Sequence, residues 1–190
     1  MIKKEQEPSN LSVETKQSNY SCEEVQLPLG FVPTSRQQLC GDIGMYIDSH
    51  GTWHYQGSPI KRKELVKLFS KVLHCDPLGN HWLITPTEIA RVHVDDAAFV
   101  IIEMNVKDLD SNQIISFRTS IDTTYNLSKA YPLRVEVNPE TKEPAPYLVL
   151  DQGLEAKLSR SVFFSLANLA VEEKIEEAHV LGIWSADIFH

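Results

Sequence analysis

Short runs of β-branched and aromatic residues, separated by turn signals, fill the second half of the chain and restrict it to folds built on sheet. The clearest runs are Arg91 to Val94, Phe99 to Met104, Ile114 to Thr119 and Leu133 to Val137, with a further strand at Tyr147 to Leu150. Polar turn segments lie between them, at residues 108–112 and 138–146. Because sequential strands joined by turns pair with one another, the pattern predicts an antiparallel, meandering sheet.

Two long amphipathic helices are expected beside the sheet. The first has apolar residues at helical intervals, at Leu65, Leu68, Phe69, Val72 and Leu73. Ser58 and Pro59 are the residue types of an N-cap and a first helical position, and the helix should end before Asp76. The second helix is expected from about Leu154 to Val171, with an apolar side formed by Leu154, Leu158, Val162, Leu166 and Leu169.

The chain is expected to be an α+β protein made of a tail and two related units. Residues 1–38 are the least patterned part and form a tail that docks partly on the body. Residues 39–88 hold a hairpin of Met45 to Ile47 and Trp53 to Tyr55, the first helix and a strand at His81 to Thr85. Residues 89–190 hold the sheet and the second helix, and end in a strand at Val180 to Trp184. Strand, glycine, helix and Trp-bearing strand recur in that order, which indicates either an internal duplication or a chance match of two common motifs.

Charge and composition exclude several classes of protein. The net charge of −8 argues against a nucleic-acid binder, which would carry a basic surface. The longest apolar run, Ala97 to Ile102, is far shorter than a membrane-spanning helix, so no membrane partner is expected. The N-terminus has no apolar segment of a secretory signal. Cys22, Cys40 and Cys75 contain no CxxC pair, which favours reduced thiols and a cytoplasmic location.

No catalytic or cofactor motif stands out, so an enzyme is the least supported class. His50 and His54 flank a turn, and His74, Cys75 and His81 lack an identifiable fourth ligand, so no metal site is expected. Asp95 and Asp96 are adjacent, and in an extended strand they point to opposite faces and cannot act as a carboxylate pair. The sequence therefore predicts no catalytic residue and no cofactor.

Several longer motifs together carry a family resemblance. In the first half these are CGDI at Cys40, GTWHYQGSPIKR at Gly51, LVKLF at Leu65 and ITP at Ile84. In the second half they are VDDAAF at Val94, FRTS at Phe117, YPLRV at Tyr131, GLEAKLSRSVFFSL at Gly153 and GIWS at Gly182. From Cys40 to its end, the chain resembles the bacterial family of domain of unknown function 1285. It differs from the usual family pattern at Ala98, Ser120 and Tyr131, where proline, asparagine and histidine are common.

The resemblance implies a fold of two α+β units with a duplicated core, the second similar to a pleckstrin-homology-like fold. It also implies a ligand site at the boundary between the units, a nucleotide-like ligand and a role in signalling. The family has no established reaction.

Arginines and aromatic residues are the main candidates for such a site. Arg62 and Arg160 occupy comparable places near the apolar edges of the two expected helices and could clamp a phosphate or carboxylate, with Glu155 holding one of them in place and Arg134 as a weaker member. Trp53 or Trp184 could stack on a base, and the hydroxyls of Thr119 and Ser185 could orient the ligand. The alternatives are that the arginines pair with structural carboxylates, the tryptophans lie in the core and the hydroxyls cap turns.

The sequence thus favours a non-catalytic protein that binds a small anionic ligand, with a nucleotide as one candidate, at the junction of its two units. The alternative is a protein–protein interaction module whose sheet offers an edge or groove to a peptide. Lys67 and Lys71 lie four residues apart on the polar face of the first helix, where an acidic partner could bind or where they could simply be solvated.

Overall fold

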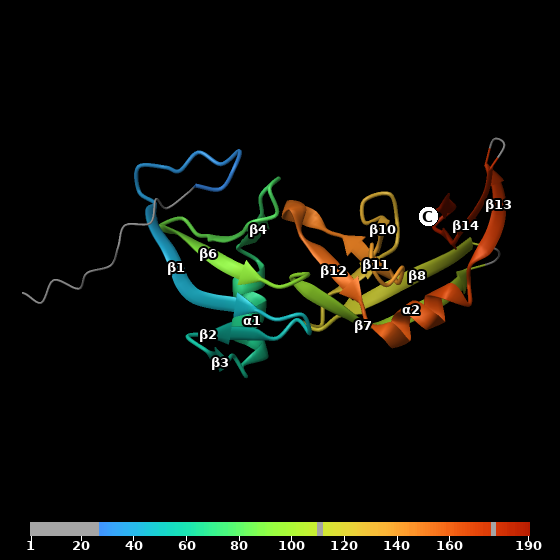
Figure 1. Cartoon of the computed structure of the whole chain (residues 1–190), viewed down its shortest axis with the longest axis horizontal. Helices are drawn as coiled ribbons and strands as arrows, with labels where there is room; N and C mark the ends of the chain where they lie inside the picture. Colours follow the sequence, from blue (N-terminus) through green and yellow to red (C-terminus); the bar gives the residue numbers. More distant parts are fainter. Residues whose placement is uncertain (1–26, 110–111, 176–177) are drawn as a thin grey trace, which may run out of the picture.

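The computed structural model describes residues 27–109, 112–175 and 178–190. Two units follow one another along the long axis of the molecule (Figure 1), each with a six-stranded sheet and one helix. Cys22 and the tail up to residue 26 lie outside the described residues. The remaining part of the tail touches the first unit, where the backbone N–H of Leu29 donates to the Asp76 carboxylate over 3.4 Å.

The first unit is a mixed sheet in the order β3-β2-β1-β6-β5-β4. Its strands are β1 (Gln38–Ile47), β2 (Trp53–Tyr55), β3 (Ser58–Pro59), β4 (Leu73–Cys75), β5 (His81–Ile84) and β6 (Glu88–Val94). The hairpin of β1 and β2 is confirmed, and Gly51 in its turn has the expected positive φ of 76°. The parallel pair β1 and β6 lies in the middle, and all other neighbours are antiparallel.

The second unit has a sheet in the order β10-β11-β12-β7-β8-β9. Its strands are β7 (Phe99–Leu109), β8 (Asn112–Thr119), β9 (Thr124–Asn126), β10 (Leu133–Val137), β11 (Pro144–Val149) and β12 (Glu155–Leu158). The short 3-10 helix η1 (Asp151–Gly153) joins β11 to β12. Two small hairpins complete the chain, β13 (Val171–Ile175) with β14 (Ala178–Gly182) and β15 (Trp184–Ser185) with β16 (Ile188–Phe189).

The two units are similar, because their sheets have the same topology. Replacing each strand of the first sheet by the strand six places later in the chain turns the order β3-β2-β1-β6-β5-β4 into the order of the second sheet. In both units the first and last of the six strands form the parallel pair, β1 with β6 and β7 with β12. The two units are therefore duplicated, but the repeat is a run of six strands and not the expected strand, glycine, helix and Trp-bearing strand. β2 corresponds to β8 and β5 to β11, and the helices are not equivalent, since α1 lies between β3 and β4 whereas α2 follows β12.

The helices differ from the sequence expectation. The first helix, α1 (Lys63–Ser70), is much shorter than expected, and Ser58 and Pro59 form β3 and pair with β2 instead of capping it. Proline is compatible with this edge position because an edge strand has one unpaired side. Leu73 belongs to β4, which pairs with β5.

The second helix, α2 (Arg160–Ala167), begins six residues later than expected, since Glu155–Leu158 forms β12. Ala156 and Leu158 are buried while Glu155 and Lys157 are partly exposed, which is the two-residue period of a strand. A spacing of four between Leu154 and Leu158 fits both periods, so the apolar pattern alone could not separate them. The expectation of two long helices was wrong.

The sheets are not purely antiparallel either, and the Arg91 to Val94 run belongs to the first sheet as part of β6. The residues after β6 explain this placement. Asp95 donates its backbone N–H to the Ile47 carbonyl over 3.0 Å and accepts a hydrogen bond from the Tyr46 hydroxyl, both on β1. The next residue, Asp96, bonds instead to Tyr147 and Lys157 of the second unit. The two aspartates thus contact different units, although they lie in a bend after β6 and not in the extended strand considered from the sequence.

One hydrophobic core runs through both units. It includes Met45, Ile47 and Leu73 of the first sheet and continues through Phe99 and Ile101 into the second. No helix in the described parts of the chain is long and apolar enough to cross a membrane.

Candidate functional site

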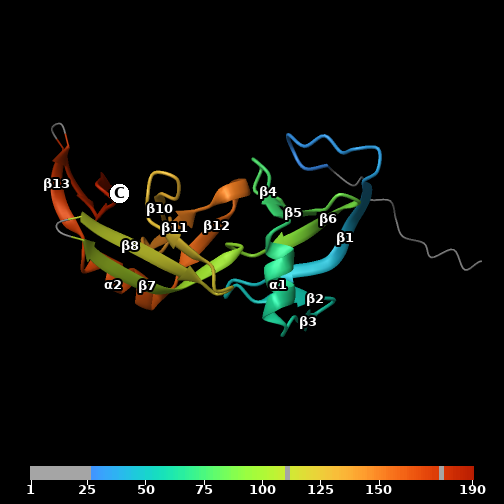
Figure 2. The ribbon, with the colours of Figure 1, turned by 180° about the vertical axis from the view of Figure 1, so that it is seen from behind.

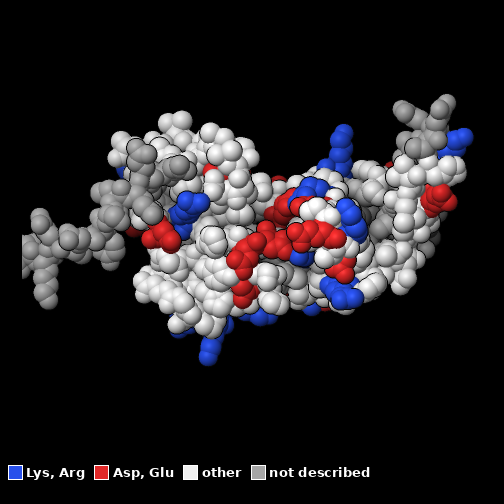
Figure 3. All heavy atoms as spheres, in the orientation of Figure 1, with Lys and Arg blue, Asp and Glu red and all other residues white. Residues whose placement is uncertain are grey.

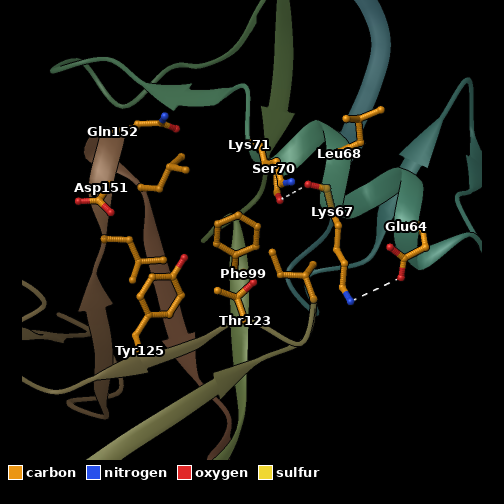
Figure 4. Close-up of a pocket in the computed structure, with 13 residues that line it drawn as sticks. Glu64, Lys67, Leu68, Ser70, Lys71, Phe99, Thr123, Tyr125, Asp151 and Gln152 are labelled. Atoms are coloured by element: carbon orange, nitrogen blue, oxygen red, sulfur yellow. Dashed lines mark hydrogen bonds and ion pairs between the residues drawn. The ribbon is translucent and has the colours of Figure 1, made fainter.

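A cleft of about 450 Å³ lies where the two units meet. Figure 4 shows α1 on one side of it, Asp151 and Gln152 on the other, and the rings of Phe99 and Tyr125 between them. The cleft thus has walls from both units. The full set of lining residues is Glu64, Lys67, Leu68, Ser70, Lys71, Phe99, Ile121, Thr123, Tyr125, Leu150, Asp151, Gln152 and Leu154.

The first wall is one face of α1. Glu64, Lys67, Leu68 and Lys71 follow one another at helical spacing and therefore lie on the same side of the helix. The opposite side contributes Val66 to the core, and Phe69 stacks on Trp53 with 6.4 Å between the ring centres. Burial of this apolar side turns the lysine-bearing side toward the second unit.

Lys67 belongs to an ion-pair network that joins the units. Its Nζ lies 3.5 Å from Glu64 and 3.8 Å from Asp122, a residue of the turn between β8 and β9. Asp122 also pairs with Lys63 at 3.4 Å and with Arg118 at 2.9 Å. These cations, Lys63 foremost, lower the pKa of the Asp122 carboxyl below its usual value.

Lys71 differs from Lys67 in having no carboxylate within ion-pair distance among the described residues. It lies one helical turn beyond Lys67 on the same wall. The cleft therefore has one cation that is shared with Asp122 and one that is left for solvent or a ligand.

The second wall combines an apolar floor with a few polar groups. The apolar lining includes Phe99, Ile121, Leu150 and Leu154. Tyr125 packs edge-on against Tyr131 with ring centres 5.0 Å apart, and burial raises the pKa of its phenol. Tyr131 donates to Asp151 over 3.0 Å, whereas the Tyr125 hydroxyl has no hydrogen-bond partner in the described part of the chain. An aromatic ring with a free hydroxyl thus faces two lysines across an apolar floor.

The cleft also contains carboxylates, since Glu64 and Asp151 line it together with Lys67 and Lys71. Figure 3 shows Asp and Glu side chains gathered over the middle of one face, with Lys and Arg beside them. In the second unit, Glu155 and Glu136 are both paired with Arg134. In the cleft, Glu64 is paired with Lys67 and Asp151 accepts a hydrogen bond from Tyr131, so Lys71 is the cation there that would attract an anion most directly.

The structure does not bring the sequence-predicted arginines together in this cleft. Arg62 is the exposed N-cap residue of α1 in the first unit. Arg160 is the exposed first residue of α2 in the second unit, and its guanidinium lies 5.6 Å from the centre of the Phe164 ring. The two helices lie in different units in both views (Figures 1 and 2). Glu155 holds neither of them, since it forms a two-point pair with Arg134 at 2.6 and 2.7 Å.

The predicted aromatic and hydroxyl residues also have other contacts. Trp53 is 2% exposed and stacks on Phe69, whereas Trp184 donates its indole N–H to Glu173 over 3.1 Å. Thr119 is fully buried and bonds to the Thr123 backbone, which closes the turn between β8 and β9. Ser185 is fully buried, accepts from the Ile115 N–H and donates to the Leu127 carbonyl.

None of the eight residues selected from the sequence lines the junction cleft. The residues that sequence reasoning missed are Tyr125, Asp151 and Gln152, which only the fold brings opposite α1. Lys67 and Lys71 carried a usable signal, because their four-residue spacing placed them together on the polar face of a helix. No feature of the neighbouring sequence indicated that this face of the helix lies opposite the second unit.

Within the described residues, no group of three or more His, Cys, Asp or Glu side chains is arranged to hold a metal ion. His54 pairs with Asp48 at 3.0 Å, and burial lowers the pKa of both His74 and His81.

Comparison with known families gives two adjoining matches. Residues 33–97 match "Domain of unknown function (DUF1285), N-terminal domain", and residues 98–190 match "Protein of unknown function (DUF1285), C-terminal domain". The two matches meet inside the linker that follows β6. A search of curated proteins returned no match.

Two solved structures are similar to the chain, and both are described as DUF1285 family proteins. The one from Silicibacter pomeroyi DSS-3 is 35% identical, with a TM-score of 0.70, and the match covers 83% of this chain and 85% of that one. The one from Shewanella baltica OS155 is 29% identical, with a TM-score of 0.53, and the match covers 66% of this chain and 91% of that one.

Proposed function

The chain belongs to the DUF1285 family, and from the geometry of the cleft between its two units we propose that it is a non-catalytic protein that binds a small anionic ligand there. The observation that carries the proposal is the pair Lys67 and Lys71 on one wall of a cleft whose other wall comes from the second unit. Lys71 has no ion-pair partner among the described residues, and Lys67 can exchange Asp122 for a ligand.

The other lining residues support a ligand with both a charged and an apolar part. A phosphate or carboxylate would lie against the two ammonium groups. An aromatic base would lie on the apolar floor near Phe99, within reach of the Tyr125 hydroxyl. A nucleotide has this combination of parts, so we place nucleotides first among the candidates.

Binding without catalysis is proposed because the cleft lacks a paired nucleophile and base. Its titratable side chains are Glu64, Lys67, Lys71, Tyr125 and Asp151, and the two carboxylates already pair with Lys67 and Tyr131. Ligand binding between two units suits a cytoplasmic signalling role, in which the second unit would act as a pleckstrin-homology-like module. These finer assignments are part of the proposal.

A thermal-shift screen followed by calorimetry tests the proposal. The probes are inorganic phosphate, pyrophosphate, nucleoside phosphates and cyclic nucleotides. A probe present at about 100 times its dissociation constant should stabilise the protein by about 2.7 kcal/mol. The double variant Lys67→Gln, Lys71→Gln should lose this shift.

Two controls separate the possible sites. Lys61→Gln removes a lysine just before α1 that does not line the cleft and should keep the shift. The variant Arg62→Gln, Arg160→Gln should keep it as well. A shift that survives the lysine variant, or that disappears only in the arginine variant, contradicts the cleft assignment, and the absence of any shift contradicts the function.

A protein-interaction module remains the second candidate. It is supported by exposed apolar side chains on an edge strand, Val135 at 57% and Val137 at 54% exposure on β10.

A further inference from the structure

The outer edge of β10 is open for pairing. β10 is the first strand of its sheet and pairs only with β11 among the described strands. It has five residues, whereas the other edge strands of the two large sheets, β3, β4 and β9, have two, three and three. A five-residue edge presents a longer row of unpaired backbone N–H and C=O groups than these short strands, and such a row is a template for strand addition.

The register shows which backbone groups of β10 face outward. The Val149 N–H donates to the Pro132 carbonyl over 3.0 Å, so residues 132, 134 and 136 turn their backbone groups toward β11. The alternate residues Leu133, Val135 and Val137 therefore point their N–H and C=O groups away from β11. Their partners in the register include Pro144 and Pro146, which have no N–H to donate.

The side chains of β10 alternate in the same way. Val135 and Val137 share one face with Leu133 and are more than half exposed. Arg134 and Glu136 share the other face, where they pair with one another at 3.0 Å. The strand thus reads Leu-Arg-Val-Glu-Val, with a cation and an anion placed symmetrically about Val135.

We propose that β10 pairs antiparallel with β10 of a second copy of this chain, about a two-fold axis at Val135. This register places Val135 opposite Val135 and Leu133 opposite Val137, and in both pairs the outward N–H and C=O groups meet. Arg134 then lies opposite Glu136 of the other copy in the non-hydrogen-bonded pairs, where side chains approach more closely. The strand is therefore complementary to itself in hydrogen bonding, apolar contact and charge.

This charge pattern favours a second copy over an unrelated segment. A random strand could use the open hydrogen bonds, but it would match both charges only by chance, and like charges directly opposite one another destabilise a pair. The result would be a closed two-fold dimer with a continuous sheet through both second units. β10 contributes no residue to the junction cleft, so this proposal and the ligand proposal can fail independently.

Sedimentation velocity on the full chain tests the dimer over concentrations from about 10 μM to about 1 mM, a range suited to weak interfaces. The wild type should shift from the mass of one chain toward that of two. Val135→Pro removes an outward N–H without removing a bond to β11, and it should remain monomeric. Val135→Thr keeps the N–H and the β-branched shape and should still dimerise.

A charge exchange tests the register itself. Glu136→Arg gives a chain with two cations on β10, and the double variant Arg134→Glu, Glu155→Arg gives two anions while keeping the intramolecular pair at residues 134 and 155. Each variant alone should be monomeric, and an equimolar mixture should form a heterodimer. A monomeric wild type throughout the range, a dimer unaffected by Val135→Pro, or a mixture that stays monomeric overturns the proposal; the first result would leave the edge to a different partner.

Discussion

At the scale of single residues, Asp76 shows how a buried charge can hold a loop. It is 8% exposed and accepts hydrogen bonds from the backbone N–H groups of Leu78 and Asn80, both at 2.9 Å, and from the Trp82 indole at 3.1 Å. Burial by itself raises the pKa of this carboxyl, but the hydrogen bonds outweigh burial and the pKa lies below its usual value. The ionised form is thus the one that the fold stabilises.

We therefore expect Asp76→Asn to destabilise the protein by about 2 kcal/mol at pH 7, since the new amide cannot accept all of these bonds. A carboxyl with a lowered folded-state pKa contributes stability above its unfolded pKa of about 3.9 and loses it as the pH falls through the folded value. Urea unfolding at pH 7 and at about pH 3 measures this. The difference between wild type and variant should shrink at the lower pH, and a constant difference would contradict the assignment.

At the scale of elements, the contact between η1 and β4 joins the two units near the cleft. Gly153 has a φ of 72°, and a Cβ added to it would lie 2.6 Å from the Cys75 carbonyl oxygen. This glycine is therefore required by its backbone conformation and also by a close approach of two backbones.

Gly153→Ala should destabilise the protein more than a change in backbone conformation alone. Gly57 provides the control, because its φ is 78° and no atom lies within 4 Å of an added Cβ. Gly57→Ala should cost about 1 to 2 kcal/mol from the left-handed conformation, and Gly153→Ala should cost more because β4 or η1 must move. Thermal unfolding of both variants measures the difference. Equal losses of stability would show that η1 and β4 accommodate the added methyl group without cost.

The helices and strands also show how much of the fold could be predicted from the sequence. The strands of the second half and the hairpin closed by Gly51 were predictable, because strand residues and turn residues alternate clearly there. The end of α1 and the start of α2 were not, because Leu73, Ala156 and Leu158 satisfy a strand period that only pairing with neighbouring strands selects. The cleft could not be predicted from the sequence, because its walls are 28 or more residues apart in the chain and are brought together only by the fold.

At the scale of the whole molecule, one core is continuous across the two units. Met45 and Leu73 of the first sheet belong to the same cluster of buried residues as Ile101 and Leu148 of the second. Separating the units would expose part of this core to water, at about 25 cal/mol for each Å² of apolar surface.

We expect a single cooperative unfolding transition. The chain has three tryptophans, of which Trp53 and Trp82 lie in the first unit and Trp184 in the second. In Trp184→Phe, fluorescence reports the first unit alone, whereas far-ultraviolet circular dichroism reports the whole chain. Urea titrations followed by the two probes should coincide, and two separate midpoints would show that the units unfold independently.

The linker between the units has a mechanical consequence. Asp95 is bonded to Tyr46 of the first unit and Asp96 to Tyr147 of the second, so neighbouring residues are fastened to different bodies. Rotation of one unit relative to the other requires free backbone between their anchored residues. Asp95 and Asp96 are joined by a single peptide unit, so little free backbone lies between them. Hydrogen bonds on both sides of this peptide therefore restrict opening of the cleft, and a ligand of the kind proposed above would have to fit the opening that the chain already provides.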